Sequence, residues 1–263
     1  MIEPIDDPGD SRLDDYRNVP DAELLERRGI FVAEGRLVVQ RLLAESRMKM
    51  RSVMLTDAAR ATLQPVLDAR PDLPIYVVPL PFMHSITSFH IHRGCLGIGE
   101  RPAECHWRTL ARGARRLVIL ERIANADNVG AVFRNAAAFG AEAVLLDRAC
   151  TDPLYRKAIR TSMGAALSIP FARVDAWPDA LRALREDGMV AIGLTPAEHA
   201  GRLTDIVHVV GDRRVALVAG HEGEGLTAET IDACDHAVRI PMARGVDSLN
   251  VATATAIALY ELS

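Results

Sequence analysis

Short apolar runs alternate with longer amphipathic runs along most of this 263-residue chain. In the second half, the runs of strand length stand at 116–123, 142–147, 168–174, 189–195, 214–220 and 236–242. The segments between them carry apolar residues at helical spacing. A strand followed by a helix, repeated many times, is typical of a largely parallel sheet covered by helices. Because ligands of such sheets bind beyond the carboxyl ends of the strands, we expect the functional residues in the loops there.

The first half shows the same alternation on a smaller scale. Runs of strand length stand at 30–35, 52–57, 74–80 and 95–100, with helical patterns at 36–46 and 57–70 between them. A stretch rich in proline, glycine and arginine then interrupts the pattern. We therefore predict a loose acidic tail at 1–19, a small α/β domain at 20–104, a linker at 105–115 and a second α/β domain at 116–263.

Composition excludes several classes of protein. The net charge is −4, so any attraction to nucleic acid must come from a local basic surface. Every apolar run is shorter than a bilayer requires, and the acidic N-terminus does not resemble a signal peptide. The four cysteines show no CxxC spacing, which argues against a disulfide framework and a zinc site. We expect a cytoplasmic protein with reduced thiols, no membrane association and no metal.

Three motifs lie at the ends of predicted strands. The first spans 121–146, where Asn128 could cap the helix that ends near Gly140. Arg134 rises from a helical face of small residues, where another molecule or subunit could approach closely. A structural ion pair is the alternative explanation of this charge.

The second motif is "VALVAGHEGEGLT" at 215–227, an apolar strand followed by a glycine-rich turn and a helix cap at Thr227. Gly220, Gly223 and Gly225 would let the backbone bend and expose its amides. The spacing is not that of a dinucleotide-binding loop, and Glu222 would repel a pyrophosphate. A cationic ligand, or one with amino and hydroxyl groups, suits this turn better; a plain tight turn is the alternative.

The third motif is "RIPMARGVDSLNVATATAIALYEL" at 239–262, where a strand, a polar turn and a helix follow one another. Ser248 and Asn250 can cap the helix, which would explain both residues without any ligand. The succession of strand, proline, loop, Ser-Leu-Asn and helix is nevertheless a longer pattern than capping requires.

In this order and spacing, the three motifs resemble the SpoU/TrmH family of RNA 2′-O-methyltransferases, within the SPOUT superfamily. The resemblance covers roughly residues 112 to 262. The first hundred residues resemble, more loosely, the substrate-binding domain often fused to such enzymes, which has an RNA-binding ribosomal-protein fold. The resemblance implies a deep trefoil knot in the C-terminal domain, S-adenosylmethionine as the cofactor, RNA as the substrate and a homodimer.

The resemblance also implies roles for particular residues. Those matching the family's cofactor contacts are Gly220, Ile240 and Leu249, with Met242, Leu194 and Thr195 alongside. Those matching its polar catalytic positions are Asn128, Arg134, Glu222, Ser248 and Asn250. Because arginine stays protonated, we expect Arg134 to bind the phosphate beside the reacting ribose and to stabilise the developing alkoxide. We expect RNA contacts from Arg134, Arg93, Arg156, Lys157 and Arg160, and we favour ribosomal over transfer RNA.

The sequence departs from the family pattern at three places. His221 stands where the family commonly has Asn, Ala252 replaces a frequent serine, and residues 124–127 replace an Asp-Pro turn. Two other functions stay open: an RNA-binding protein of the same fold without catalysis, and a dinucleotide-dependent oxidoreductase. The missing phosphate-loop spacing argues against the oxidoreductase.

Overall fold

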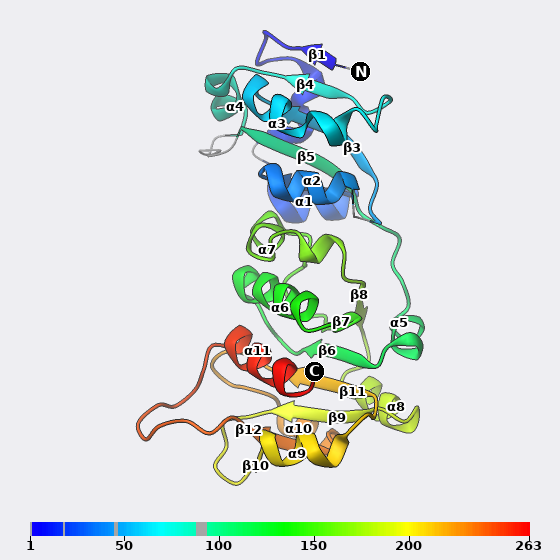
Figure 1. The fold of residues 1–263 in the computed structure, drawn as a ribbon, viewed down its shortest axis with the longest axis vertical. Coiled ribbons are helices and arrows are strands. Elements are labelled where there is room, and N and C mark those ends of the chain that lie inside the picture. Colours follow the sequence, from blue (N-terminus) through cyan, green and yellow to red (C-terminus); the bar gives the residue numbers. More distant parts are fainter. Residues whose placement is uncertain (1, 18, 45–46, 88–93) are drawn as a thin grey trace. The chain divides into compact units, whose positions relative to one another are not determined.

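The computed structural model describes residues 2–17, 19–44, 47–87 and 94–263 (Figure 1). The chain divides into two compact units, each with its own set of internal contacts. The first unit consists of residues 1–103 and 153–168, and the second of residues 104–152 and 169–263. The segment 153–168, which we placed in the C-terminal domain from the sequence, thus packs with the first unit.

Among its described residues, the first unit holds one sheet of five strands in the order β1-β4-β3-β5-β2. Its strands are β1 (Ile2–Pro4), β2 (Ile30–Glu34), β3 (Met50–Leu55), β4 (Ile75–Val77) and β5 (Cys95–Glu100). Its helices are η1 (Ser11–Tyr16), α1 (Asp21–Arg27), α2 (Arg36–Ala44), α3 (Asp57–Leu67), α4 (Leu80–Thr87), α7 (Arg156–Thr161) and η2 (Ala165–Leu167). Strand β4 runs parallel to β1 and β3, whereas β5 runs antiparallel to β2 and β3.

The expectation of a loose acidic tail is wrong for the described residues before α1. Strand β1 pairs with β4, and the side chains of Ile5, Leu13 and Tyr16 are buried in the core of this unit. The hydroxyl group of Tyr16 also shares a hydrogen bond of 2.7 Å with that of Ser52. The acidic residues face outward while the apolar residues between them anchor the segment, so net charge was a poor guide to its order.

The second unit is described throughout and holds a parallel sheet of seven strands in the order β10-β12-β9-β11-β6-β7-β8. Its strands are β6 (Arg116–Leu120), β7 (Ala143–Asp147), β8 (Phe171–Val174), β9 (Val190–Leu194), β10 (Gly201–Arg202), β11 (Val215–Ala219) and β12 (His236–Arg239). Its helices are α5 (Trp107–Gly113), α6 (Ala126–Ala138), α8 (Asp179–Glu186), α9 (Leu203–Val210), α10 (Ala228–Ala233) and α11 (Val251–Glu261). The predicted parallel α/β architecture is confirmed.

Helices cover both faces of this sheet. Alternate strand residues, such as Leu117 and Val218, form a buried core with α5, α8 and α10. Helices α6, α9 and α11 pack on the other face, where α11 lies against α6 and β11. Helix α5 occupies most of the predicted linker, and its Ala111 is buried in the core of the second unit. The arginine-rich stretch is therefore part of this unit's fold.

Several local predictions need correction. Helix α6 begins two residues before Asn128, and Asn125 caps it by accepting a hydrogen bond from the backbone N–H of Asp127 at 2.9 Å. Asn128 therefore lies in the first turn, and its side chain is available for other contacts.

The trefoil knot and the ribosomal-protein likeness of the first unit stay predictions. Among the residues described here, no helix combines the length and the apolar character needed to cross a membrane.

Candidate active site

A cavity of about 220 Å³ lies at the carboxyl ends of β9, β11 and β12. These strands contribute Leu194, Ala219 and Val238 to its wall, and the segment between β12 and α11 contributes most of the rest. All the residues predicted to bind the cofactor line it: Leu194, Thr195, Gly220, Ile240, Met242 and Leu249. The parallel sheet therefore positions the cavity where its topology favours ligand binding.

The glycine-rich loop 220–225 forms one side of the cavity and is closely packed on itself. A Cβ atom at Gly220 would lie 2.6 Å from the backbone of both Gly225 and Leu226, so only glycine fits there. Gly225 has a φ of +69°, and its N–H donates to the carbonyl of His221 at 2.9 Å. The loop is thus a defined turn rather than a slack connection.

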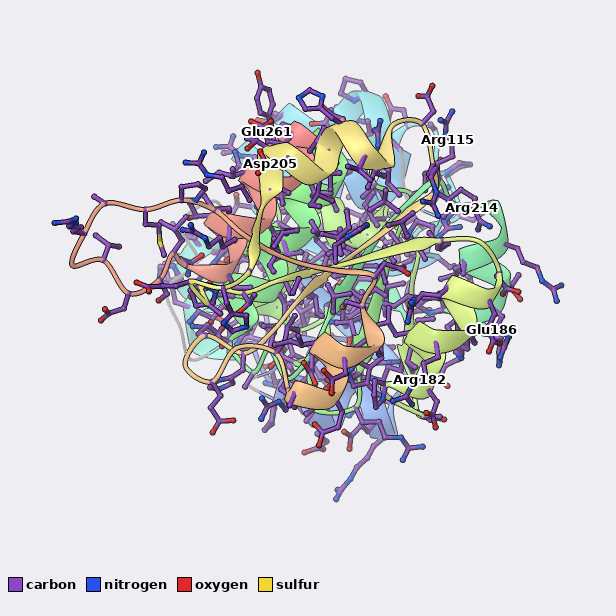
Figure 2. All side chains as sticks on the ribbon, turned by 90° about the horizontal axis from the view of Figure 1, so that it is seen from below. Arg115, Arg182, Glu186, Asp205, Arg214 and Glu261 are labelled. Carbon is purple, nitrogen blue, oxygen red and sulfur yellow. The ribbon has the colours of Figure 1, made fainter. Side chains whose placement is uncertain are left out.

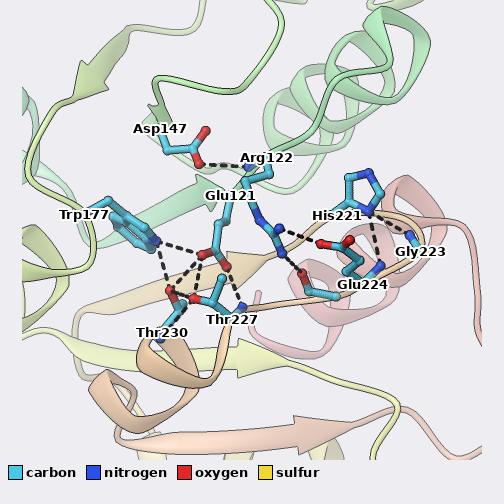
Figure 3. A network of polar contacts seen from close by, with 10 residues as sticks. Glu121, Arg122, Asp147, Trp177, His221, Gly223, Glu224, Thr227 and Thr230 are labelled. Atoms are coloured by element: carbon cyan, nitrogen blue, oxygen red, sulfur yellow. Dashed lines mark hydrogen bonds and ion pairs between the residues drawn. The ribbon is translucent and has the colours of Figure 1, made fainter.

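Arg122, directly after β6, holds this loop from outside. Its guanidinium donates to the carboxylate of Glu224 at 2.6 Å and to the carbonyl of Gly225 at 3.3 Å (Figure 3). Its backbone has a φ of +57°, a left-handed conformation that a non-glycine residue rarely adopts. The backbone N–H donates to the carboxylate of Asp147 at 3.0 Å, which helps to fix this conformation.

Glu121, the residue before Arg122, anchors the far end of the same loop. Its buried carboxylate accepts hydrogen bonds from the indole N–H of Trp177, the backbone N–H and hydroxyl of Thr227, and the hydroxyl of Thr230 (Figure 3). A buried carboxylate is tolerated when donors surround it in this way. Thr227 also caps α10, as the sequence predicts.

Three of the predicted catalytic residues form one hydrogen-bonded chain. The side-chain amide of Asn250 donates to the side-chain oxygen of Asn128 at 2.9 Å. The amide of Asn128 donates in turn to the carboxylate of Glu222 at 2.5 Å. Asn250 at the same time caps α11 by accepting from the backbone N–H of Ala252. Glu222 lines the cavity, as does Ser248, the fourth predicted residue.

Arg134, the fifth predicted catalytic residue, does not join this group within one chain. It lies six residues after Asn128 on α6, which puts it about 9 Å further along the axis and on a different side of the helix. Its side chain is exposed and does not line the cavity. Ala137 and Ala138 beside it are exposed as well, so this side of the helix is open to a close approach.

The residues predicted to contact RNA lie mostly on α7 of the first unit. Arg160 lies 3.7 Å from the carboxylate of Glu34, and the backbone N–H of Arg156 donates to the carboxylate of Asp21 at 3.1 Å. Burial raises the pKa of Asp21, and the charge of Arg156 opposes that rise. Contacts of this kind stabilise the fold and do not require RNA. Lys157 is exposed, and Arg93 lies outside the described residues.

Charges of both signs are interspersed over the second unit. Arg182, Glu186 and Asp205 are exposed examples (Figure 2).

In the described part of the chain, no three His, Cys, Asp or Glu side chains come together as a possible metal site.

Sequence reasoning missed the residues that hold the loop from outside. Glu121 and Arg122 follow an apolar run, and their sequence positions give no sign of partners about a hundred residues away. Asp247 lines the cavity too, and its position beside Ser248 in the third motif was the signal that could have identified it.

Comparisons with known proteins agree on one family. Residues 115–260 match the sequence model of the SpoU rRNA Methylase family. A relative in Mycobacterium bovis, named "uncharacterized tRNA/rRNA methyltransferase", is 41% identical over 99% of this chain and 91% of its own length. A 23S rRNA (guanosine-2′-O-)-methyltransferase of Photobacterium profundum is 39% identical over 55% of this chain and 58% of its own.

One solved structure matches nearly the whole chain. It is the AdoMet-bound rRNA methyltransferase of Sinorhizobium meliloti, which is 25% identical, with a TM-score of 0.84. The match covers 99% of this chain and 97% of that one, so both units have counterparts in it.

Proposed function

Because this chain belongs to the SpoU rRNA Methylase family, we propose that it transfers a methyl group from S-adenosylmethionine to a ribose 2′-hydroxyl of structured RNA. The observation that carries the proposal is the convergence of two features. The cavity is lined by the predicted cofactor residues, and the chain Asn250–Asn128–Glu222 ends at its wall.

The cavity suits S-adenosylmethionine in chemistry as well as in position. An adenine ring would find apolar surface at Val238, Ile240 and Leu249. The close packing at Gly220 makes the backbone of loop 220–225 part of the cavity wall. The carboxylates of Glu222 and Asp247, both at the cavity, favour a ligand that carries positive charge. When bound, the cofactor supplies an electrophilic methyl group on a sulfonium.

The protein's own residues would align and polarise the acceptor. Asn128 is fixed from both sides, by Asn250 and by Glu222, so its side chain holds one orientation. Such a fixed polar group can orient a ribose hydroxyl in line with the methyl group, and this alignment accounts for much of the acceleration. Ser248 at the cavity wall would position the nucleotide. The methyl–sulfur bond would break as the new carbon–oxygen bond forms, and the hydroxyl proton would pass to water.

Arg134 would act on the cavity of a second copy of the chain. Within one chain it lies apart from the cavity, on an open face of α6 with small exposed neighbours. A symmetric dimer that uses this face would bring the guanidinium toward the partner's bound RNA, without any change within the chain. There it would bind a phosphate and stabilise the developing alkoxide. A homodimer is therefore part of the proposal.

Ribosomal RNA in the cytoplasm is the substrate that we favour. Two of the similar proteins described above are named rRNA methyltransferases, and one name specifies the guanosine 2′-oxygen. The broader name of the Mycobacterium relative, tRNA/rRNA methyltransferase, includes transfer RNA as the second candidate.

Mapping 2′-O-methyl marks in total RNA tests this function. Cells that lack the gene should lose a mark that returns with the wild-type gene and not with an Arg134→Ala variant. If every 2′-O-methyl mark persists in the deleted cells, the proposed function is wrong. A protein that only binds RNA would give that result.

A further inference from the structure

We propose that His221 is a positioning residue whose neutral imidazole holds loop 220–225 in the shape that binds the cofactor. Protonation of this imidazole releases the loop, so affinity for S-adenosylmethionine falls as the pH falls. The inference rests on the proposed function, since that function assigns the cofactor to the cavity.

The contacts of the imidazole define the role of its Nδ1 atom. Its Nδ1 atom accepts a hydrogen bond from the backbone N–H of Gly223 at 3.0 Å and another from that of Glu224 at 3.1 Å (Figure 3). Backbone N–H groups can only donate, so Nδ1 must present its lone pair to both. The proton of the neutral ring is therefore on Nε2. His221 acts here as an acceptor inside the turn.

Protonation would turn this acceptor into a donor that faces two donors. Both hydrogen bonds would be lost, and the turn between His221 and Gly225 would lose its internal support. The same turn presents Glu222 to Asn128, and loop residues on both sides of Glu222 line the cavity. Loss of these two hydrogen bonds would therefore disturb the cavity wall that the loop forms. It would also disturb the chain Asn250–Asn128–Glu222, which orients the ribose hydroxyl.

Charged groups from three segments lie on the loop that carries the imidazole, against that loop or at the same cavity. Glu222 and Glu224 lie on its own loop, Arg122 approaches from the end of β6, and Asp247 lines the same cavity from the segment before α11. Histidine is the side chain that ordinarily changes charge between about pH 5 and 8, so the measurement is made within that range.

Asparagine provides a matched control for the imidazole. Its Oδ1 atom is one bond beyond Cγ, as Nδ1 is in histidine, and it accepts hydrogen bonds from the backbone two residues further on. Asparagine does not titrate in this range. A His221→Asn variant should therefore keep the turn and lose the pH dependence, whereas His221→Ala should lose the turn at every pH.

Calorimetric titration of the full-length protein with S-adenosylmethionine alone tests the inference between pH 5.5 and 7.5. Wild-type affinity should fall about tenfold toward pH 5.5, the scale expected for two lost hydrogen bonds. The fall should be much smaller in His221→Asn, and His221→Ala should bind weakly throughout. His208→Asn is the control, because His208 is exposed on α9 and does not line the cavity; it should follow the wild type.

Two results would overturn the inference. One is wild-type affinity that does not change with pH, and the other is a His221→Asn variant with the pH dependence of the wild type. Either result leaves the proposed methyl transfer intact. An absence of binding at every pH would contradict the proposed cofactor and this inference together. Circular dichroism of each variant across the same range separates loss of binding from loss of fold.

Discussion

The side-chain amide of Asn250 donates to the side-chain oxygen of Asn128 at 2.9 Å, across 122 positions of sequence. This bond joins the first turn of α6 to the cap of α11 and continues through Asn128 to Glu222 on the glycine-rich loop. The three motifs that stand apart in the sequence thus meet in one hydrogen-bonded chain beside the cavity.

Replacing Asn128 with Ala should slow methyl transfer by about 10- to 100-fold. The substitution removes two hydrogen bonds, and the one to the carboxylate of Glu222 alone corresponds to about 1.5–3 kcal/mol. Affinity for S-adenosylmethionine should change little, because Asn128 does not line the cavity. Single-turnover kinetics and calorimetry measure the two effects separately. A variant with wild-type kcat would show that the chain of amides has no catalytic role.

Replacing Gly220 with Ala should abolish cofactor binding. The added methyl group would overlap the backbone at Gly225 and Leu226, which cannot move aside without opening the loop. Gly113→Ala at the end of α5 is the matched control, since a Cβ there would meet no atom within 4 Å and Gly113 does not line the cavity. Calorimetry on both variants gives the answer. Equal binding by both would contradict the packing described for this loop.

Replacing Arg122 with Ala should weaken cofactor binding about tenfold. The loop would lose an ion pair and a hydrogen bond that tie it to the end of β6, and it would become free to open. Arg148→Ala is the control, because the ion pair of Arg148 with Asp175 is exposed and includes no residue of the loop. Comparable losses in the two variants would mean that Arg122 acts only through general stability.

Cysteine labelling should distinguish one reactive thiol from the other three. Burial raises the pKa of the Cys95 and Cys234 thiols to about 12, and it raises that of Cys150 further. The thiolate is the reactive form, so these groups stay inert at pH 8, whereas Cys105 is exposed. Mass spectrometry after brief alkylation should find label on Cys105 alone, and on all four after unfolding in guanidinium. Rapid labelling of folded Cys234 would contradict its burial.

Mixing two impaired variants tests the role of Arg134 in a dimer. If Arg134 acts on the partner's cavity, an exchanged mixture of Asn128→Ala and Arg134→Ala chains regains activity. Half of the dimers are then mixed and each has one intact site, so about one quarter of the wild-type rate should return. Each variant alone is the control. Activity that stays at the level of the single variants would place Arg134 in its own chain's site or outside catalysis.

The sequence predicted the strands and the cavity well because both depend on local patterns. Apolar runs identified β5 with its bounds, and every predicted cofactor residue lines the cavity. Helix α9 was missed although Leu203, Ile206, Val207 and Val210 stand at helical spacing, because its valine and isoleucine residues also favour a strand. The cap at Asn125 was missed because Asn128 is an equally good capping residue three positions later.

Other features depend on tertiary contacts that no local pattern reveals. Arg122 meets Glu224 across 102 positions, and segment 153–168 packs with strands that precede it by more than a hundred residues. Arg134 is a separate case, since the small residues around it are visible in the sequence. In the proposed dimer, a second chain would determine what these residues contact.

The most direct test is the chemical identity of the methylated product. Purified protein is incubated with methyl-labelled S-adenosylmethionine and unmodified ribosomal RNA, and the RNA is then digested to nucleosides and separated. The wild type should place the label in a 2′-O-methylnucleoside, and Gly220→Ala should transfer none. Label on a base, or no label on RNA from a wild type that binds the cofactor, would contradict ribose methylation at this cavity.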